Sequence, residues 1–242
     1  FRVFKVTSPM SVGSWILGSF ATAASLPALY EADKLTKQKL PLPRFARKAL
    51  GAAAGPAGVV AGVLGGPLAG YTAVLLGNTS NPTWNDAKKH LAYVFVSSAS
   101  AAASGCAMVF TPVEHAGPAR ALGMAAAASD LAATKIMEEN MEPETVAPLH
   151  KGKPGKLMKA SEYLIAAGGV GTAVAAATKS RTLSVLSGLS LMAGSACTRF
   201  GVLNAGIEAV KDPATTIEPQ KRRAARKRAQ EGLAHSVVTS KH

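Results

Sequence analysis

Four charged side chains stand within stretches of sequence that are otherwise apolar, and their type and position make them candidates for chemistry. Asp130 and Lys135 share one such stretch, Glu162 enters another, and Arg199 lies near the end of the last. Inside a membrane such charges are costly and usually face a cavity or a partner. A structural ion pair, or snorkelling to the interface, is the alternative explanation. Asp130 lies deepest by sequence, so it is the stronger functional candidate.

Cysteine and histidine are too scattered to hold a metal or a haem. Cys106 and Cys197 stand alone in separate apolar stretches, whereas iron–sulfur clusters usually need four thiolates. The 5 histidines lie in loops, at a span edge or in the tail, so no pair is placed to ligate a haem inside the membrane. No zinc-site spacing is present either. The sequence predicts that this chain binds no metal ion, no haem and no iron–sulfur cluster.

Three other stretches carry no charge at all and are long enough to cross a membrane. No Asp, Glu, Lys or Arg occurs within 6–30, 49–85 or 90–113, and about 20 mostly apolar residues cross the hydrocarbon of a bilayer. The chain is 48% hydrophobic and 17% charged, against about 25% charged in soluble proteins. This composition excludes a disordered chain, a coiled coil and a disulfide scaffold. It also disfavours a soluble helical core, which would have to hide several charge-free segments.

The sequence therefore predicts an all-α, polytopic transmembrane helix bundle with about six spanning helices. The expected spans are 10–30, 55–76, 91–110, 119–137, 157–177 and 183–203. They form a membrane domain at 1–210, followed by a polar, basic tail at 211–242. Pro67 is expected to kink or shorten the second span. The pairs Gly51/Gly55 and Gly66/Gly70 have the spacing that lets helix backbones approach closely in lipid.

Basic residues set the expected orientation. Six spans put both termini on one side, and that side collects more lysine and arginine than the other, above all at 151–159 and 221–228. The positive-inside rule then predicts a multi-pass cell-membrane protein with cytoplasmic termini, although the loop between the first two spans is also basic. The basic tail is interpreted as an anchor near anionic membrane lipid. Nucleic-acid binding, the other use of such a run, is disfavoured directly after a membrane domain.

Three blocks of aromatic and polar residues lie on the side of the predicted termini. They are SPMSVGSWIL at 8–17, NTSNPTWNDA at 78–87 and SACTRFGVLNAG at 195–206. Their tryptophans are Trp15 and Trp84, and their charged members are Asp86 and Arg199. An interfacial aromatic belt would explain the tryptophans. The alternative is a shallow pocket lined by aromatic rings, a carboxylate and an arginine.

These blocks, with DP at 212–213 and EPQ at 218–220, resemble the NrfD family, also called polysulfide reductase membrane subunits. They occur in family order, the similarity spans about residues 1–220, and the first block is the most specific. Members have eight or more membrane helices, so the chain resembles the C-terminal, larger part of one, with earlier helices expected before it. Many relatives have Trp-His-Glu in the second block. Here it is Trp84-Asn85-Asp86, which argues against a histidine-based proton role at that position.

The resemblance implies a membrane anchor subunit of an oxidoreductase complex. Electrons would pass between menaquinone or another quinone and a docked ferredoxin-like iron–sulfur subunit, which usually leads to a molybdopterin catalytic subunit. A quinol also releases protons, so its site needs hydrogen-bond partners and a proton exit. Asp86, Asp130 and Arg199 are expected to supply these groups. Trp15, Trp84 and Arg199 are expected beside the quinone headgroup.

Two other functions stay open. The chain would be a proton or small-solute transporter without a redox role if Asp130, Lys135 and Glu162 line a path. Alternatively, it would be a structural anchor that only docks its partner. A neighbouring gene for a ferredoxin-type subunit favours the quinone-reactive subunit or the anchor, and quinone-dependent turnover separates these two.

Overall fold

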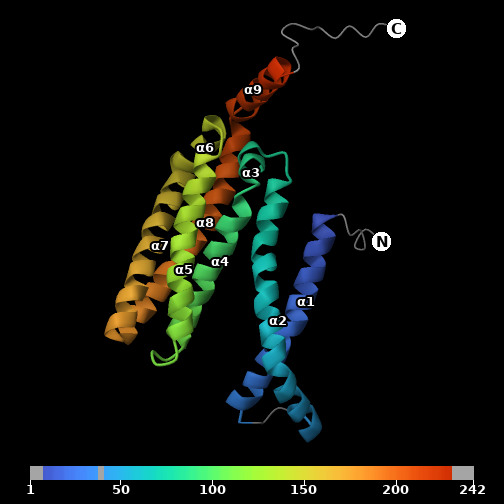
Figure 1. The fold of residues 1–242 in the computed structure, drawn as a ribbon, viewed down its shortest axis with the longest axis vertical. Coiled ribbons are helices and arrows are strands. Elements are labelled where there is room, and N and C mark those ends of the chain that lie inside the picture. The colour runs from blue at the N-terminus through green and yellow to red at the C-terminus, as the bar shows by residue number, and fades with distance from the viewer. Residues whose placement is uncertain (1–7, 38–40, 231–242) are drawn as a thin grey trace.

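The chain is helical throughout the part described by a computed structural model, residues 8–37 and 41–230, which contains no strand. The six longest helices are α1 (Pro9–Leu35), α2 (Arg44–Gly77), α4 (Leu91–Phe110), α5 (Gly117–Glu139), α7 (Gly152–Thr178) and α8 (Arg181–Lys211). The shorter helices are α3 (Pro82–Ala87), α6 (Pro143–His150) and α9 (Ala214–Gln230). Along the chain the long helices alternate in direction, and the start of α1 and the end of α8 face the same way (Figure 1). The predicted all-α membrane bundle is confirmed.

Each predicted span lies within one of the six long helices. Among the described helices, α1, α2, α4, α7 and α8 are long and apolar enough to cross a membrane. The sixth, α5, has 23 residues, or about 34 Å at 1.5 Å per residue. It is less apolar because it contains Arg120, Asp130 and Lys135. It packs against α4 and α7, and Asp130 is buried there, whereas Lys135 is exposed.

Proline does not interrupt these helices as the sequence suggested. α2 continues unbroken through Pro56 and Pro67 to Gly77, so Pro67 does not shorten the second span. The other expectation, a kink at Pro67, stays a prediction. A membrane helix tolerates proline when neighbouring groups satisfy the freed carbonyl. Proline also stands in the first turn of α1, α3, α5 and α6, where its missing N–H costs no helical hydrogen bond.

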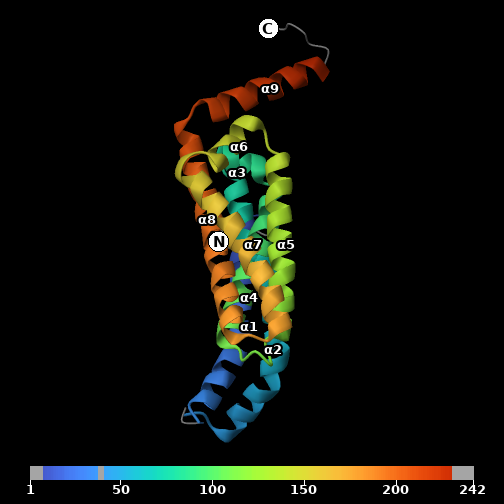
Figure 2. The same cartoon turned by 90° about the vertical axis from the view of Figure 1, so that its left-hand side faces the viewer.

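The long helices form two assemblies. α4, α5, α7 and α8 pack together as a four-helix bundle, whereas α1 packs against α2 and only α2 reaches the bundle closely, through α4. The α1–α2 hairpin extends past the four-helix bundle at the end opposite α3 and α6 (Figures 1 and 2). α9 crosses the end that carries α3 and α6 at a steep angle to α8 (Figure 2). We call this end the α3–α6 end.

Hydroxyl groups and glycines join the helices of the bundle. The Ser98 hydroxyl of α4 donates to the Ser195 hydroxyl of α8 at 2.9 Å. α4 and α8 also meet where a Cβ on Gly105 would overlap the carbonyl oxygen of Gly188. The glycine pairs predicted from spacing are wrong for Gly55 and Gly66, because a Cβ at either would meet no atom within 4 Å. Spacing therefore did not identify the glycines at which backbones meet.

Candidate functional site

Asp130 lies at the centre of the polar interior. It is 3% exposed, and Asp33 is the other carboxylate residue that is buried in the described part of the chain. The hydroxyl oxygen of Ser97 on α4 lies 3.2 Å from Asp130 Oδ1 on α5. It also lies 2.8 Å from the carbonyl oxygen of Tyr93 and 3.1 Å from that of Val94, so its one hydrogen is shared among three acceptors. The Arg199 guanidinium on α8 is close enough to attract the Asp130 carboxylate electrostatically. Three helices thus bring a hydroxyl, a carboxylate and a guanidinium together, and we call Ser97, Asp130 and Arg199 the Asp130 cluster.

The backbone and an aromatic ring of α4 hold Arg199 in place. Its Nη2 donates to the carbonyl oxygen of Phe95 at 3.3 Å. The guanidinium carbon also lies 5.1 Å from the centre of the Phe95 ring, within the range of a cation–π interaction. Because Phe95 is buried, these contacts hold the half-buried Arg199 side chain against α4.

A polar cavity of ≈ 330 Å³ opens beside Asp130, between α5, α7 and α8. Its polar lining consists of Asp130, Thr134, Lys135, Glu138, His150, Lys159, Ser161, Glu162 and Thr198. Because His150 is the last residue of α6, the cavity runs from Asp130 toward the α3–α6 end. His150 Nε2 lies 3.5 Å from Glu138 Oε2 there. The cavity brings together Asp130, Lys135 and Glu162, the residues expected to line a path in a transporter.

α3 joins two of the sequence blocks. Trp84 Nε1 donates to the carbonyl oxygen of Val202 at 2.9 Å. The ring lies on Gly206 so closely that a Cβ there would overlap it. Asn81 Nδ2 also donates to the Gly206 carbonyl oxygen at 2.8 Å. The second block is therefore in direct contact with the third, and Trp84 is partly buried against α8.

Asp86 connects α3 to the start of α6. Its Oδ2 accepts a hydrogen bond from the Glu142 backbone N–H at 2.8 Å and another from the Thr145 hydroxyl. A carboxylate at the first turn of a helix satisfies N–H groups that have no partner within the helix. These contacts give Asp86 a structural role in holding α6.

The five predicted site residues occupy three places in the fold. Asp130 and Arg199 are together inside the bundle, and Trp84 and Asp86 are together on α3. Trp15 lies on α1, is 38% exposed, and does not line the polar cavity. The structure therefore brings the predicted carboxylate and arginine together and leaves Trp15 apart from them.

Sequence reasoning missed three residues of the site. The first is Ser97. The sequence did contain an indication of it, because polar residues recur every three or four positions and so share one face of α4. They are His90, Tyr93, Ser97 and Ser100. The other two are Glu138 and His150. No pattern in the neighbouring sequence indicated that they line a cavity, because they reach it only where α5 and α6 meet α7.

The metal-free prediction remains a prediction. Among the described residues, no group of three or more His, Cys, Asp or Glu is placed to hold a metal ion. Cys106 and Cys197 are both free thiols in separate helices, α4 and α8.

No family model matches this chain, and no curated protein and no solved structure is similar enough to count as a match. The resemblance to the NrfD family therefore rests on the three sequence blocks.

Proposed function

We propose that this chain is the membrane anchor subunit of an oxidoreductase complex that exchanges electrons between a membrane quinone, menaquinone or another, and a docked ferredoxin-like iron–sulfur subunit. The observation that supports this most directly is the Asp130 cluster at the inner end of the polar cavity. Charged groups within a membrane bundle are costly and mark paths for protons, ions or substrates. The three sequence blocks connect this cluster to quinone chemistry.

The cluster has the groups that quinol oxidation requires. The reaction removes two electrons, which go to the iron–sulfur partner, and two protons, which need an acceptor inside the bundle and a way out. The Asp130 carboxylate is the acceptor, and the polar cavity with Glu138 and His150 is the way out. The Arg199 guanidinium stabilises the negative charge of the Asp130 carboxylate before it accepts a proton. Quinone reduction uses the same groups in reverse.

The α3–α6 end is where the proposed iron–sulfur subunit docks. It carries Lys88 and Lys89, the lysines of 151–159, and the basic helix α9. Arg222 of α9 pairs with Glu144, with Nη1 2.9 Å from Oε2, which ties α9 to α6. A basic surface suits an acidic partner, and the positive-inside rule puts this end in the cytoplasm of a cell-membrane protein. The molybdopterin catalytic subunit binds to the iron–sulfur subunit in turn.

Quinol oxidation by the assembled complex tests the proposal. Membranes that contain the complex are given a short-chain menaquinol and an artificial electron acceptor. Asp130→Asn keeps the shape of the side chain and removes its proton-accepting charge, so turnover should fall about 100-fold, within the range for loss of a general base. Glu114→Gln removes an exposed carboxylate charge in the turn between α4 and α5, at the opposite end of the bundle; it is the control and should keep full turnover. Full turnover in Asp130→Asn would refute the role of the cluster.

A second function is favoured by the same cavity. Lys135, Glu138, Lys159 and Glu162 are more ionisable groups than one quinol site requires, and they suit a proton path with no redox step. The isolated chain in liposomes with an internal pH dye distinguishes the two. Proton flux without quinone or partner, abolished by Asp130→Asn, would favour the transporter. Vesicles that stay impermeable to protons would favour the quinone-reactive subunit.

A further inference from the structure

A second, larger hollow lies on the other side of Asp130. This groove between α4 and α5 has a volume of ≈ 590 Å³, and we call it the α4–α5 groove. On the α4 side it is lined by His90, Tyr93, Val96, Ser97 and Ser100. On the α5 side it is lined by small residues, Ala125, Ala126, Ser129, Ala132 and Ala133, between Leu122 and Ile136. One wall therefore carries hydrogen-bonding groups, and the other is flat and largely apolar.

The α4–α5 groove is open on the outside of the bundle. Tyr93 is 69% exposed, and Leu122 and Ile136 are each 48% exposed. In a membrane that surface faces lipid or neighbouring protein, so a ligand would enter from the hydrocarbon. The lining has no lysine or arginine, so an anionic phospholipid headgroup finds no counter-charge. A neutral, flat ring with two oxygens and an apolar tail fits this combination of walls.

Ser97 connects the groove to the polar cavity. It lines the groove and is 7% exposed. Its hydroxyl oxygen lies 3.2 Å from Asp130 Oδ1, within hydrogen-bond distance, beside the Tyr93 and Val94 carbonyl oxygens of its own helix. Asp130 in turn lines the polar cavity. A hydroxyl can accept one proton and donate another, so a single side chain separates the groove from the carboxylate.

We infer that the quinone headgroup binds in the α4–α5 groove beside Ser97, and that the Ser97 hydroxyl passes protons between the quinone and Asp130. This inference rests on the proposed function and names its substrate site. On quinol oxidation both O–H bonds break, and both electrons go to the iron–sulfur partner. The first proton reaches Asp130 through Ser97, and Asp130 releases it into the polar cavity before it accepts the second.

The other large groove lacks these features. It lies between α1, α2 and α4, with a volume of ≈ 540 Å³, and its polar side chains are Ser8 and Tyr71. Neither belongs to the Asp130 cluster. A quinone headgroup there would have no route for its protons to a buried carboxylate, so this groove suits only an apolar chain.

Filling the α4–α5 groove tests the binding site. Ala125→Trp and Ala132→Trp each put a large ring into it, and both positions are exposed, so the bundle tolerates the added volume. Ala128→Trp is the matched control, because Ala128 is exposed on α5 and lines neither hollow. In the assembled complex we expect the quinol KM to rise at least tenfold in both groove variants, and photolabelling by an azido-quinone to be lost from α4 and α5. The control should stay within twofold of the unmodified complex.

Changing Ser97 tests the proton relay. Ser97→Ala should lower kcat at least tenfold with little change in KM, because the headgroup still binds but cannot pass its proton. Ser97→Thr keeps a hydroxyl and should restore most of kcat, and the slow variant should show an altered solvent deuterium isotope effect. If Ser97 had only a structural role, the alanine and threonine variants would not differ in kcat and in the isotope effect in this way.

The outcomes separate this inference from the proposed function. If the unmodified complex shows no quinone-dependent turnover, the proposed function fails. If it is active, but the groove variants keep its KM and the azido-quinone labels other helices, the function stands and the α4–α5 groove site is overturned. Labelling that phospholipid displaces without any change in turnover would identify a lipid site and also overturn it.

Discussion

The α1–α2 hairpin and the four-helix bundle are both made of long helices but are held together differently. Only 6% of the most apolar part of α1 is buried, against 44% of that of α4 and of α8. The hairpin is joined at its turn by Arg47 and Asp33, with Nε 2.9 Å from Oδ2. The bundle is joined along its length by buried hydroxyls and the Asp130 cluster. Apolar residues keep a helix in the membrane, whereas buried polar residues determine which helices meet.

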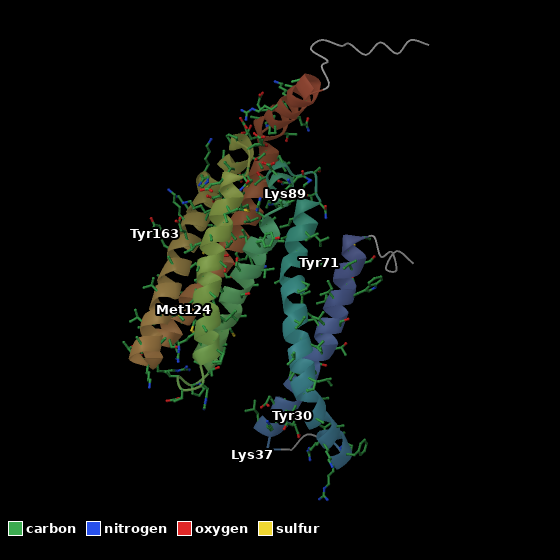
Figure 3. All side chains as sticks on the ribbon, in the orientation of Figure 1. Tyr30, Lys37, Tyr71, Lys89, Met124 and Tyr163 are labelled. Carbon is green, nitrogen blue, oxygen red and sulfur yellow. The ribbon has the colours of Figure 1, made fainter. Side chains whose placement is uncertain are left out.

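In the hairpin, aromatic rings make the contacts between helices that hydroxyl groups make in the bundle. A Cβ on Gly13 of α1 would overlap the Tyr71 ring of α2, and one on Gly51 of α2 would lie 3.2 Å from the Tyr30 ring of α1. Tyr30 and Lys37 mark the turn end of the hairpin, and Tyr71 lies toward its other end (Figure 3). Such contacts are apolar and carry no proton, so the hairpin offers no chemistry comparable to that of the bundle.

The largest expected effect comes from removing the arginine of the bundle. Arg199→Ala removes the guanidinium hydrogen bond to the Phe95 carbonyl oxygen, the contact with the Phe95 ring and a nearby positive charge from the buried Asp130 carboxylate, which together contribute about 2–4 kcal/mol. We expect the free energy of unfolding in mixed detergent micelles to fall by that amount. Adding Asp130→Asn should recover part of the loss. An Arg199→Ala chain as stable as the unmodified one would show that the two groups do not depend on each other.

The next effect contrasts glycines in the two assemblies. Gly105→Ala forces α4 and α8 apart, because its Cβ overlaps the Gly188 carbonyl oxygen, and overpacking costs about 1–3 kcal/mol. Gly62→Ala in α2 meets no atom within 4 Å and should be neutral or stabilising by up to about 1 kcal/mol. Unfolding of both variants in the same micelles checks the sign of each change. Equal changes in the free energy of unfolding for the two variants would contradict the proposed difference in packing between the hairpin and the bundle.

A smaller effect is expected where α3 meets α6. Asp86→Asn keeps an oxygen that accepts from the Glu142 N–H but loses the charge, which costs about 0.5–1 kcal/mol at a helix start. Because its contacts are structural, quinone-dependent turnover should stay within twofold, and membrane insertion should not change. A slower turnover with unchanged stability would instead mean that the Asp86 carboxylate moves protons, as the sequence resemblance implied.

The smallest effect belongs to the hairpin. Trp15→Ala removes an exposed ring, and surface changes usually stay within about 0.5 kcal/mol. Turnover and KM should both be unchanged. An increase in KM here would mean that the quinone contacts α1, so it would favour the groove between α1, α2 and α4 over the α4–α5 groove.

Some of the fold follows from local sequence. Charge-free segments of more than 20 residues predict spanning helices, because lipid offers backbone groups no hydrogen-bond partners and the helix satisfies them internally. That reason is independent of neighbours and applies directly to the spans at 10–30, 55–76 and 91–110. The spans at 119–137, 157–177 and 183–203 contain charges, so they followed from their apolar composition and not from a charge-free segment of that length. The charges of Asp130 and Arg199 inside apolar stretches also marked them as candidates without any knowledge of the fold.

Contacts between helices were not determined by local sequence. Gly55 and Gly66 have the right spacing and meet nothing, whereas Gly105 and Gly188, far apart in the chain, meet each other. The sequence by itself determined which segments form long, largely apolar helices and which charges those helices carry. Only the tertiary structure decided that α4, α5 and α8 bring Ser97, Asp130 and Arg199 together. Contacts between helices join residues far apart in the chain, so no regular spacing of residues in the sequence indicates them.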